Sequence, residues 1–277
     1  MSVTQEIVRA DDPLDLSLSE AELDSYREHI TDFIQSQLDA AGVDRAVIGL
    51  SGGIDSTLTS HLLVEALGAE NVHGLVMPSE VNRDENMSDA ERVASELLDI
   101  EYDVVAIQPI VETVLDAYPD AADDRLATGN LRVRTRAVLN YLVANHEDAL
   151  VVGTGNRSEA LVGYFTKYGD GAVDCHPIAN LYKGQVRQLA KHLGVPDDLA
   201  EKTASAEMWL DQTDEGELGM DYETLDSILA LHVDGPLSPS ATARHVGVDE
   251  SAVEKVRGLY EGSAHKRKAP PGPDPLY

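Results

Sequence analysis

A stretch rich in glycine and serine constrains this chain more than any other feature of its sequence. It reads Gly49-Leu50-Ser51-Gly52-Gly53-Ile54-Asp55-Ser56 and lies between an apolar run at residues 45–48 and a helix-forming run at residues 57–67. This order predicts a buried strand, a sharp turn and a helix. The glycines let backbone amides approach a ligand closely, and the start of a helix adds free N–H groups and a positive dipole end. We therefore expect a phosphate-binding loop here.

The predicted loop has no lysine of its own. No Gly-Lys-Ser/Thr follows it, and the first lysine of the chain is Lys167, so the loop is not of the Walker type. We expect it to hold phosphate with its amides, with the hydroxyls of Ser51 and Ser56, and with a metal ion on Asp55. The simpler alternative is an ordinary strand-to-helix turn capped by Asp55 or Ser56, which the six-residue match in this context disfavours.

The sequence Ser51-Gly52-Gly53-Ile54-Asp55-Ser56 resembles the signature of the ATP pyrophosphatase (PP-loop) superfamily. Enzymes of this group cleave ATP between the α- and β-phosphates and leave an adenylate on the substrate. The resemblance implies that Gly49 to Ser56 hold the phosphates of ATP.

Apolar runs and helical periodicities alternate along the first 150 residues. Short runs rich in valine, isoleucine and leucine, separated by helices, predict a parallel sheet covered on both faces. Ligands of such sheets bind outside the carboxyl ends of the strands. We expect an α/β fold with a doubly wound parallel sheet of the Rossmann type, similar to adenine nucleotide α-hydrolases, and a helical C-terminal extension. The expected strands are 45–48, 71–78, 102–107 and 149–153, and the expected helices are 19–42, 57–67, 84–98, 110–115, 129–144, 184–193, 221–231 and 249–260.

The domain organisation follows from composition. Residues 1–17 are acidic and irregular, and we expect a flexible lead-in there. Residues 18–268 form a single catalytic domain in this interpretation. A polar, glycine-containing segment at about 203–219 is too long for a plain connector and predicts a mobile lid. Residues 269–277 are a proline-rich tail.

The chain is strongly acidic. It has 21 Lys and Arg against 50 Asp and Glu, and a formal net charge of −29, which argues against nucleic acid as a partner. Regular apolar periodicity argues against acidic disorder. The one cysteine, Cys175, excludes an internal disulfide and a cysteine-based zinc site. No apolar run is long enough to span a bilayer, and no leader sequence is visible, so we expect a cytoplasmic protein with no membrane partner.

The charge predicts dependence on salt. Self-repulsion of this size strains a compact fold in dilute buffer, whereas at molar salt the Debye length falls to about 3 Å and most of the repulsion is screened. We expect a protein from a high-salt cytosol that loses its circular-dichroism signal on dialysis to low salt. Retention of the full signal in dilute buffer would contradict this expectation.

Later motifs narrow the resemblance. Several motifs resemble those of ammonia-dependent NAD⁺ synthetase and follow one another in one consistent order over roughly residues 20 to 268. The acidic charge resembles that of a haloarchaeal type of this family. This family forms the C–N bond of NAD⁺ from deamido-NAD⁺, ATP and ammonia. The motifs are Gly129-Asn130-Leu131-Arg132-Val133-Arg134, Gly153-Thr154-Gly155-Asn156-Arg157-Ser158-Glu159, Gly163 to Gly171, Asp174, Leu181-Tyr182-Lys183, Gln212-Thr213-Asp214-Glu215 and His265-Lys266.

The resemblance implies specific roles. Asp55 and Glu159 hold Mg²⁺, which prefers few carboxylates together with phosphate oxygens and water. The other implied ATP contacts are Thr154, Lys183 and Ser205, and the implied deamido-NAD⁺ contacts are Arg134, Lys167, Asp174, His265 and Lys266. The implied catalytic residues are Asp55, Lys183 and Asp174, with Lys183 stabilising the leaving pyrophosphate and Asp174 taking a proton from ammonium. The family also implies a homodimer.

Some alternatives stay open. For Glu159 the simpler role is an acid in the first turn of a helix. A solvated surface charge fits Arg136 and Lys268 about as well as a functional role does. Residues 203–207 depart from the family, since Thr203, Ala204 and Glu207 replace expected prolines and glycine, which leaves the role of Ser205 open.

Two other functions compete with this one. The first is another PP-loop enzyme, such as a tRNA-modifying one, which the absence of zinc-spaced cysteines and of a basic surface disfavours. The second is a regulator that binds ATP without turnover. No glutamine-hydrolysing segment is visible, so free ammonia is the expected nitrogen source.

Overall fold

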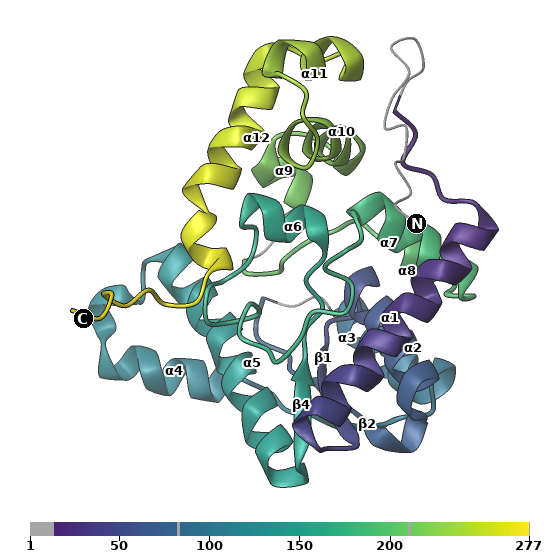
Figure 1. Cartoon of the computed structure of the whole chain (residues 1–277). Helices are drawn as coiled ribbons and strands as arrows, with labels where there is room; N and C mark the ends of the chain where they lie inside the picture. Colours follow the sequence, from purple (N-terminus) through teal and green to yellow (C-terminus); the bar gives the residue numbers. More distant parts are fainter. Residues whose placement is uncertain (1–13, 82–83, 210–211, 277) are drawn as a thin grey trace.

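The structure is a computed structural model that describes residues 14–81, 84–209 and 212–276. Its centre is a four-stranded parallel sheet in the order β3-β2-β1-β4 (Figure 1). The prediction of a parallel α/β sheet is confirmed. The strands are β1 (Arg45–Leu50), β2 (Val72–Val76), β3 (Glu101–Val104) and β4 (Ala149–Val152).

Strand β1 lies in the middle of the sheet because both of its faces are apolar. Ala46 pairs with Val72 of β2 on one side and with Leu150 of β4 on the other. Successive side chains point to opposite faces, so Ile48 packs into one core and Val47 into the other. A strand buried on both faces ends at a fixed place, and its end positions the glycine loop.

Helices cover both faces of the sheet. One face packs against α2 (Ile54–Leu67), with α1 (Glu20–Ala41) and α7 (Lys183–His192) beside it, and the other packs against α5 (Arg125–Glu147) and α4 (Gln108–Ala117) (Figure 1). Helix α3 (Asp84–Arg92) and a π-helical turn (Val93–Leu97) connect β2 to β3. The doubly wound arrangement is therefore present.

Local signals explain where two helices begin. Ser19 and Glu22 form a capping box at the start of α1, and Gly42 ends the helix at φ 73°. Helix α5 begins at Arg125, earlier than the expected residue 129, because the Asp124 side chain accepts hydrogen bonds from the amides of Leu126 and Ala127. This cap was missed in the sequence, where Gly129 had suggested a boundary.

A second helical cluster follows the sheet and forms the C-terminal extension (Figure 1). It places apolar residues such as Leu225, Ile228 and Val253 in a core of its own. Its helices are α6 (Arg157–Val162), α9 (Asp214–Leu218), α10 (Tyr222–Ile228), a π-helical turn (Leu229–Val233), α11 (Pro239–Val246), α12 (Glu250–Gly262) and a 3₁₀ turn (Ala264–Arg267).

Several short elements were not predicted. Helices α6 and α8 (Asp197–Ala200) span few residues and have no readable periodicity. The 3₁₀ turns Ala69–Asn71 and Pro119–Ala121 likewise escape a period-based search. The predicted lid segment contains α9, and its described residues 203–209 and 212–213 lie outside helices and strands.

The chain ends lie only partly within the described range. Of the predicted lead-in, residues 1–13 fall outside the described residues. Leu14 donates its amide to His245 Nε2 over 2.8 Å, and Leu16 packs on the C-terminal cluster. The described end of the lead-in is thus attached to α11 and its neighbours. None of the helices in the described ranges is long and apolar enough to cross a membrane.

Candidate active site

A cavity of about 260 Å³ opens at the carboxyl ends of β1 and β4. It is lined by all eight residues of the predicted phosphate loop, Gly49 to Ser56. Thr154, Glu159, Lys183 and Ser205, which come from three other parts of the chain, line it as well. Every residue expected to contact ATP or the metal therefore faces one cavity.

The loop turns because of Gly52. Its φ of 73° is left-handed, and a Cβ there would lie 2.1 Å from the backbone oxygen of Asn86. Ser51 and Ser56 face one another, with 3.1 Å between their hydroxyl oxygens. Helix α2 begins at Ile54, with no side chain capping Gly53. The loop therefore presents hydroxyls and helix-start amides to the cavity, as a phosphate site requires.

Lys183 lies between two carboxylates at the centre of the site. Its side chain is 2 % exposed, and Nζ contacts Asp55 Oδ2 and, at 3.2 Å, Glu159 Oε1. The acids reach it from the first turns of α2 and α6, and the lysine is the first residue of α7. Three helix starts thus converge on one buried ion cluster.

Neighbouring side chains fix the acids. Asn156 Nδ2 donates to Asp55 Oδ1 over 2.8 Å. Asn156 also forms a capping box with Glu159 at the start of α6. The first-turn role considered for Glu159 is therefore real, and it coexists with the contact to Lys183.

The electrostatics of the cluster favour an additional cation. Burial opposes the charge on Lys183, but Asp55 and Glu159 outweigh burial and raise its pKa above the usual value. Burial raises the pKa of Glu159 to about 8, although Lys183 acts in the opposite direction. Burial also raises the pKa of Asp214. Burial thus disfavours the ionised form of Glu159, and a cation bound beside Asp55 and Glu159 would favour it.

The donor set fits a magnesium ion that shares its coordination with phosphate. No cluster of three or more His, Cys, Asp or Glu residues suited to a metal occurs among the described residues. Asp55 and Glu159 supply hard oxygen ligands, and Mg²⁺ is commonly held by one or two carboxylates with phosphate oxygens and water. Within the described ranges, the arrangement suits a metal that arrives with a nucleotide.

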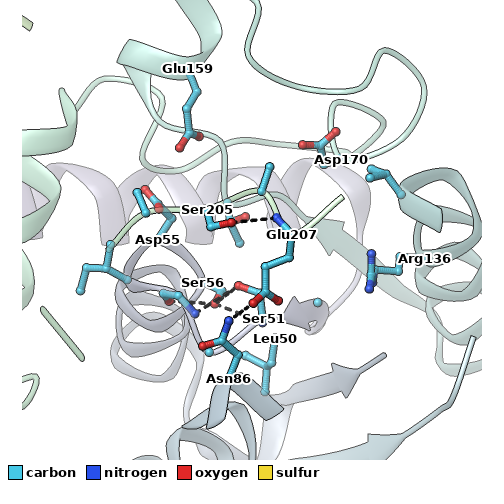
Figure 2. Close-up of a pocket in the computed structure, with 18 of the residues that line it drawn as sticks. Leu50, Ser51, Asp55, Ser56, Asn86, Arg136, Glu159, Asp170, Ser205 and Glu207 are labelled. Atoms are coloured by element: carbon cyan, nitrogen blue, oxygen red, sulfur yellow. Dashed lines mark hydrogen bonds between the residues drawn. The ribbon is translucent and has the colours of Figure 1, made fainter. Parts of the chain in front are cut away.

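Residues 202–207, which follow α8, line one side of the cavity. Lys202 Nζ contacts Asp89 and lies 3.4 Å from the Gly52 backbone oxygen. Ser205 Oγ donates to the Gln212 backbone oxygen over 2.7 Å and accepts from the Glu207 amide. Figure 2 shows Glu207 reaching toward Asn86, whose Nδ2 donates to Glu207 Oε1.

Two lining residues were missed or misjudged in the sequence. Arg136 points to the cavity (Figure 2), and its Nε donates to the Met77 backbone oxygen over 3.0 Å. Burial lowers its pKa to about 10, so the surface-charge alternative for Arg136 is wrong. Asp170 also lines the cavity, and burial raises its pKa to about 6 although the Thr166 amide donates to it. The helical spacing of Arg136 from Val133 and Asn140 was the available signal.

The residues expected to contact deamido-NAD⁺ lie outside this lining. Arg134 Nη2 donates to the Lys167 backbone oxygen over 3.2 Å, and Lys167 Nζ donates to the His265 backbone oxygen over 2.8 Å. These three residues form a neighbouring cluster. Lys266 Nζ donates to the backbone oxygens of Gly163 and Phe165 over 2.8 and 2.7 Å.

Asp174 stands apart from both groups. Its carboxylate accepts from the Val151 amide over 2.8 Å and from the Tyr141 hydroxyl over 3.1 Å. The residue is exposed and does not line the cavity. A role for Asp174 in deprotonating ammonium inside the cavity therefore has no geometric support within this protomer.

Comparison with known proteins decides the family. The family described as NAD synthase matches residues 26–270 of the chain. The chain belongs to this family. An NH(3)-dependent NAD(+) synthetase from Halobacterium salinarum is 62 % identical over 94 % of the chain and 97 % of the relative.

Solved structures of similar proteins agree with the fold. An NMN synthetase from Francisella tularensis aligns with a TM-score of 0.80 and 33 % identity, over 93 % of this chain and 100 % of that one. An NH3-dependent NAD synthetase from Campylobacter jejuni aligns with a TM-score of 0.76 and 29 % identity over the same shares. The sequence-based prediction of the family is confirmed.

Proposed function

We infer that this chain uses ATP to amidate deamido-NAD⁺ with ammonia, forming NAD⁺. The observation that carries the proposal is the buried Lys183–Asp55–Glu159 cluster at the end of a phosphate loop. Such a cluster meets the needs of a reaction that cleaves ATP at its α-phosphate, because charge develops on the departing pyrophosphate. Membership of the NAD synthase family supports deamido-NAD⁺ as the acceptor of the adenylyl group.

The first chemical step is adenylation of the acceptor. The nicotinate carboxylate attacks the α-phosphorus, the bond to the β-phosphate oxygen breaks, and pyrophosphate leaves. Loop amides and the hydroxyls of Ser51 and Ser56 hold the phosphates, while Lys183 stabilises the leaving group. Asp55 and Glu159 would hold Mg²⁺ together with the nucleotide, and the ion would neutralise more of the phosphate charge.

The second step joins ammonia to the activated carboxyl group. The nitrogen attacks the acyl carbon of the adenylate, AMP leaves, and NAD⁺ forms. Ammonium must lose a proton before it can attack, and Asp170 is a solvent-accessible carboxyl group in the lining of the cavity, outside the cluster around Lys183. We assign the proton acceptance to Asp170 in place of Asp174, which we keep as a contact for the dinucleotide.

Replacing Asp170 by asparagine tests this assignment. If Asp170 accepts the proton, the enzyme uses ammonium, and KM for total ammonium stays nearly constant between pH 7 and 9, because a carboxyl group with a pKa of about 6 is ionised there. In D170N only free ammonia reacts. The fraction of total ammonium that is free ammonia rises about tenfold with each unit of pH in this range, so KM for total ammonium falls about tenfold per unit. Equal pH profiles for the two proteins would remove Asp170 from the role.

We also propose that the chain acts as a homodimer. Large apolar side chains are exposed along α4 and α5, on the side of the sheet where Arg134 and Asp174 lie. Exposed apolar patches of this kind mark contact surfaces. They comprise Ile110, Val114, Tyr118, Leu126, Val138 and Leu142. Sedimentation at molar salt should give twice the monomer mass, and a monomer at assay concentrations would contradict the proposal.

The similarity to an NMN synthetase supports a second candidate reaction, amidation of the mononucleotide acid. Parallel assays with ATP, Mg²⁺ and ammonium, containing either deamido-NAD⁺ or nicotinate mononucleotide, separate the two. We expect a higher kcat/KM for deamido-NAD⁺. A preference for the mononucleotide would replace the proposed substrate, and activity with glutamine but not ammonium would replace the nitrogen source.

A further inference from the structure

The lid segment (residues 203–209) rests on one face of α5. Arg125, Gly129 and Arg132 lie at helical positions i, i+4 and i+7, which share a face. The guanidinium of Arg125 stacks 4.4 Å from the centre of the Trp209 ring. Gly129 faces Met208, since a Cβ on the glycine would lie 2.9 Å from Met208 Cε and 3.1 Å from Met208 Cβ. Met208 of the lid therefore packs directly against the backbone of α5 at Gly129.

Arg132 joins this face to the lid by hydrogen bonds. Its Nη1 donates to the Met208 backbone oxygen over 3.2 Å, and its Nη2 donates to Glu80 Oε1 over 2.7 Å. Arg132 is 6 % exposed, and the structure gives its buried Nε no acceptor among the described residues. A buried guanidinium with an unused donor is costly to maintain. A function for the hydrogen bond from Arg132 Nη1 to the Met208 backbone oxygen would explain why the chain keeps this costly side chain.

The opposite side of the lid is held at α3 and the phosphate loop. Glu207 accepts from Asn86, and Lys202, just before the lid, contacts Asp89 and the Gly52 backbone oxygen. Figure 2 shows Ser205 and Glu207 in the middle of the lining residues, between Asp55 and Arg136. The lid is therefore held on both sides of the cavity, and Arg132 holds the α5 side.

We propose that Arg132 is a positioning residue that latches the lid over the acyl adenylate and thereby keeps water from it. This inference rests on the proposed function. Two nucleophiles can attack the acyl carbon of the adenylate. Ammonia displaces AMP and forms NAD⁺, with release of a proton. Water breaks the same bond to the AMP phosphate oxygen and regenerates deamido-NAD⁺, so that the net reaction is hydrolysis of ATP to AMP and pyrophosphate.

The latch therefore controls the ratio of AMP to NAD⁺. With the lid closed, each AMP formed accompanies one NAD⁺. With the latch weakened, water reaches the adenylate and AMP exceeds NAD⁺. More ammonium should restore the ratio, because ammonia then outcompetes water. A residue that merely stabilised the fold would lower AMP and NAD⁺ together and leave their ratio at one.

Two variants weaken the latch in different ways. Arg132→Gln removes the charge, the bond to Met208 and the ion pair with Glu80. Gly129→Ala adds a methyl group against Met208 but favours the helix, because alanine has the higher helix propensity. Arg92→Gln is the matched control, since Arg92 pairs with Asp198 over 2.6 Å and does not line the cavity. At limiting ammonium we expect AMP to exceed NAD⁺ by roughly twofold or more in R132Q. A smaller excess is expected in G129A, and a ratio of one in R92Q and in the parent protein.

The position of the lid can also be measured without catalysis. The chain has one tryptophan, Trp209, and it lies in the lid. Quenching of its fluorescence by acrylamide in molar KCl should increase about twofold in R132Q and stay unchanged in R92Q.

Two results would overturn the latch. One is unchanged quenching in a folded R132Q, or in G129A should R132Q fail to fold. The other is a one-to-one product ratio at limiting ammonium in whichever of these variants is folded. Failure of the parent protein to form NAD⁺ would reject the proposed function, while the quenching result would still decide the contact between Arg132 and the lid.

Discussion

Replacing Lys183 by methionine should lower kcat for NAD⁺ formation by about a thousandfold. Removal of a preorganised charge from a buried site lowers kcat by a factor of about 10²–10³, and this lysine is the central cation of the site. Methionine keeps the unbranched stem but leaves Asp55 and Glu159 facing each other without their ammonium. Loss of one partner from a buried ion cluster also destabilises the fold by about 3–5 kcal/mol. The thermal midpoint at molar KCl should therefore fall along with activity.

The matched control is Lys191→Met. Lys191 belongs to the same helix as Lys183, but its side chain is 42 % exposed and pairs with Glu201 over 2.7 Å. Exposed pairs contribute little, so K191M should keep nearly all activity and stability. A folded K183M enzyme with a tenth or more of the parent kcat would show that Lys183 does not carry the charge stabilisation.

Replacing Asp55 by asparagine should lower kcat by about 10²–10³. Asparagine still offers an oxygen to Asn156 Nδ2, which now lies 2.8 Å from Asp55 Oδ1, so the local geometry is largely preserved. What is lost is a negative charge between Lys183 and the expected magnesium position. Turnover should therefore fall more than ATP affinity, as measured by steady-state kinetics and by calorimetry.

Asp44→Asn is the control for this substitution. Asp44 is exposed and precedes β1, at the opposite end of the strand from the loop. D44N should behave like the parent protein. If D55N instead loses mainly ATP affinity, and the parent protein shows no turnover, the chain is better described as a nucleotide sensor than as an enzyme.

The sequence predicted the centre of the site because its signals are local. Gly52 must adopt a left-handed φ and leave room for the Asn86 backbone, so the glycine pattern is readable without the fold. Parallel strands bring their carboxyl ends to one edge, so Thr154 and the loop were expected to lie together. Strands β1 and β2 were found because a strand buried on both faces is a continuous apolar run, whereas β3 is mostly exposed.

The rest of the site depends on contacts between distant residues. Asp170 lies within one of the quoted motifs and Arg136 follows another, but the sequence assigned neither a place in the cavity lining, which depends on the fold. Asp226 is a further example. It accepts from the Gly184 amide over 2.9 Å and from Ser158, which in turn accepts from the Lys183 amide over 2.9 Å. No sequence pattern predicts that α10 fixes the start of α7 in this way.

The arrangement of the residues expected to contact the dinucleotide was only partly predictable from one chain. Arg134, Lys167 and His265 do lie together, joined through backbone oxygens, although they are far apart in sequence. Asp174 is exposed and accepts a hydrogen bond from Tyr141 of α5. The proposed homodimer would cover this side, so the contacts of these residues with the substrate remain a proposal about the assembly.

The most direct test of the account is the stoichiometry of the parent enzyme. The protein would be incubated with deamido-NAD⁺, ATP, Mg²⁺ and ammonium in molar KCl, and NAD⁺, AMP and pyrophosphate would be measured in the same samples. Equal amounts of all three products are expected, with no ADP. Formation of ADP and phosphate, or absence of ATP cleavage by well-folded protein, would contradict it.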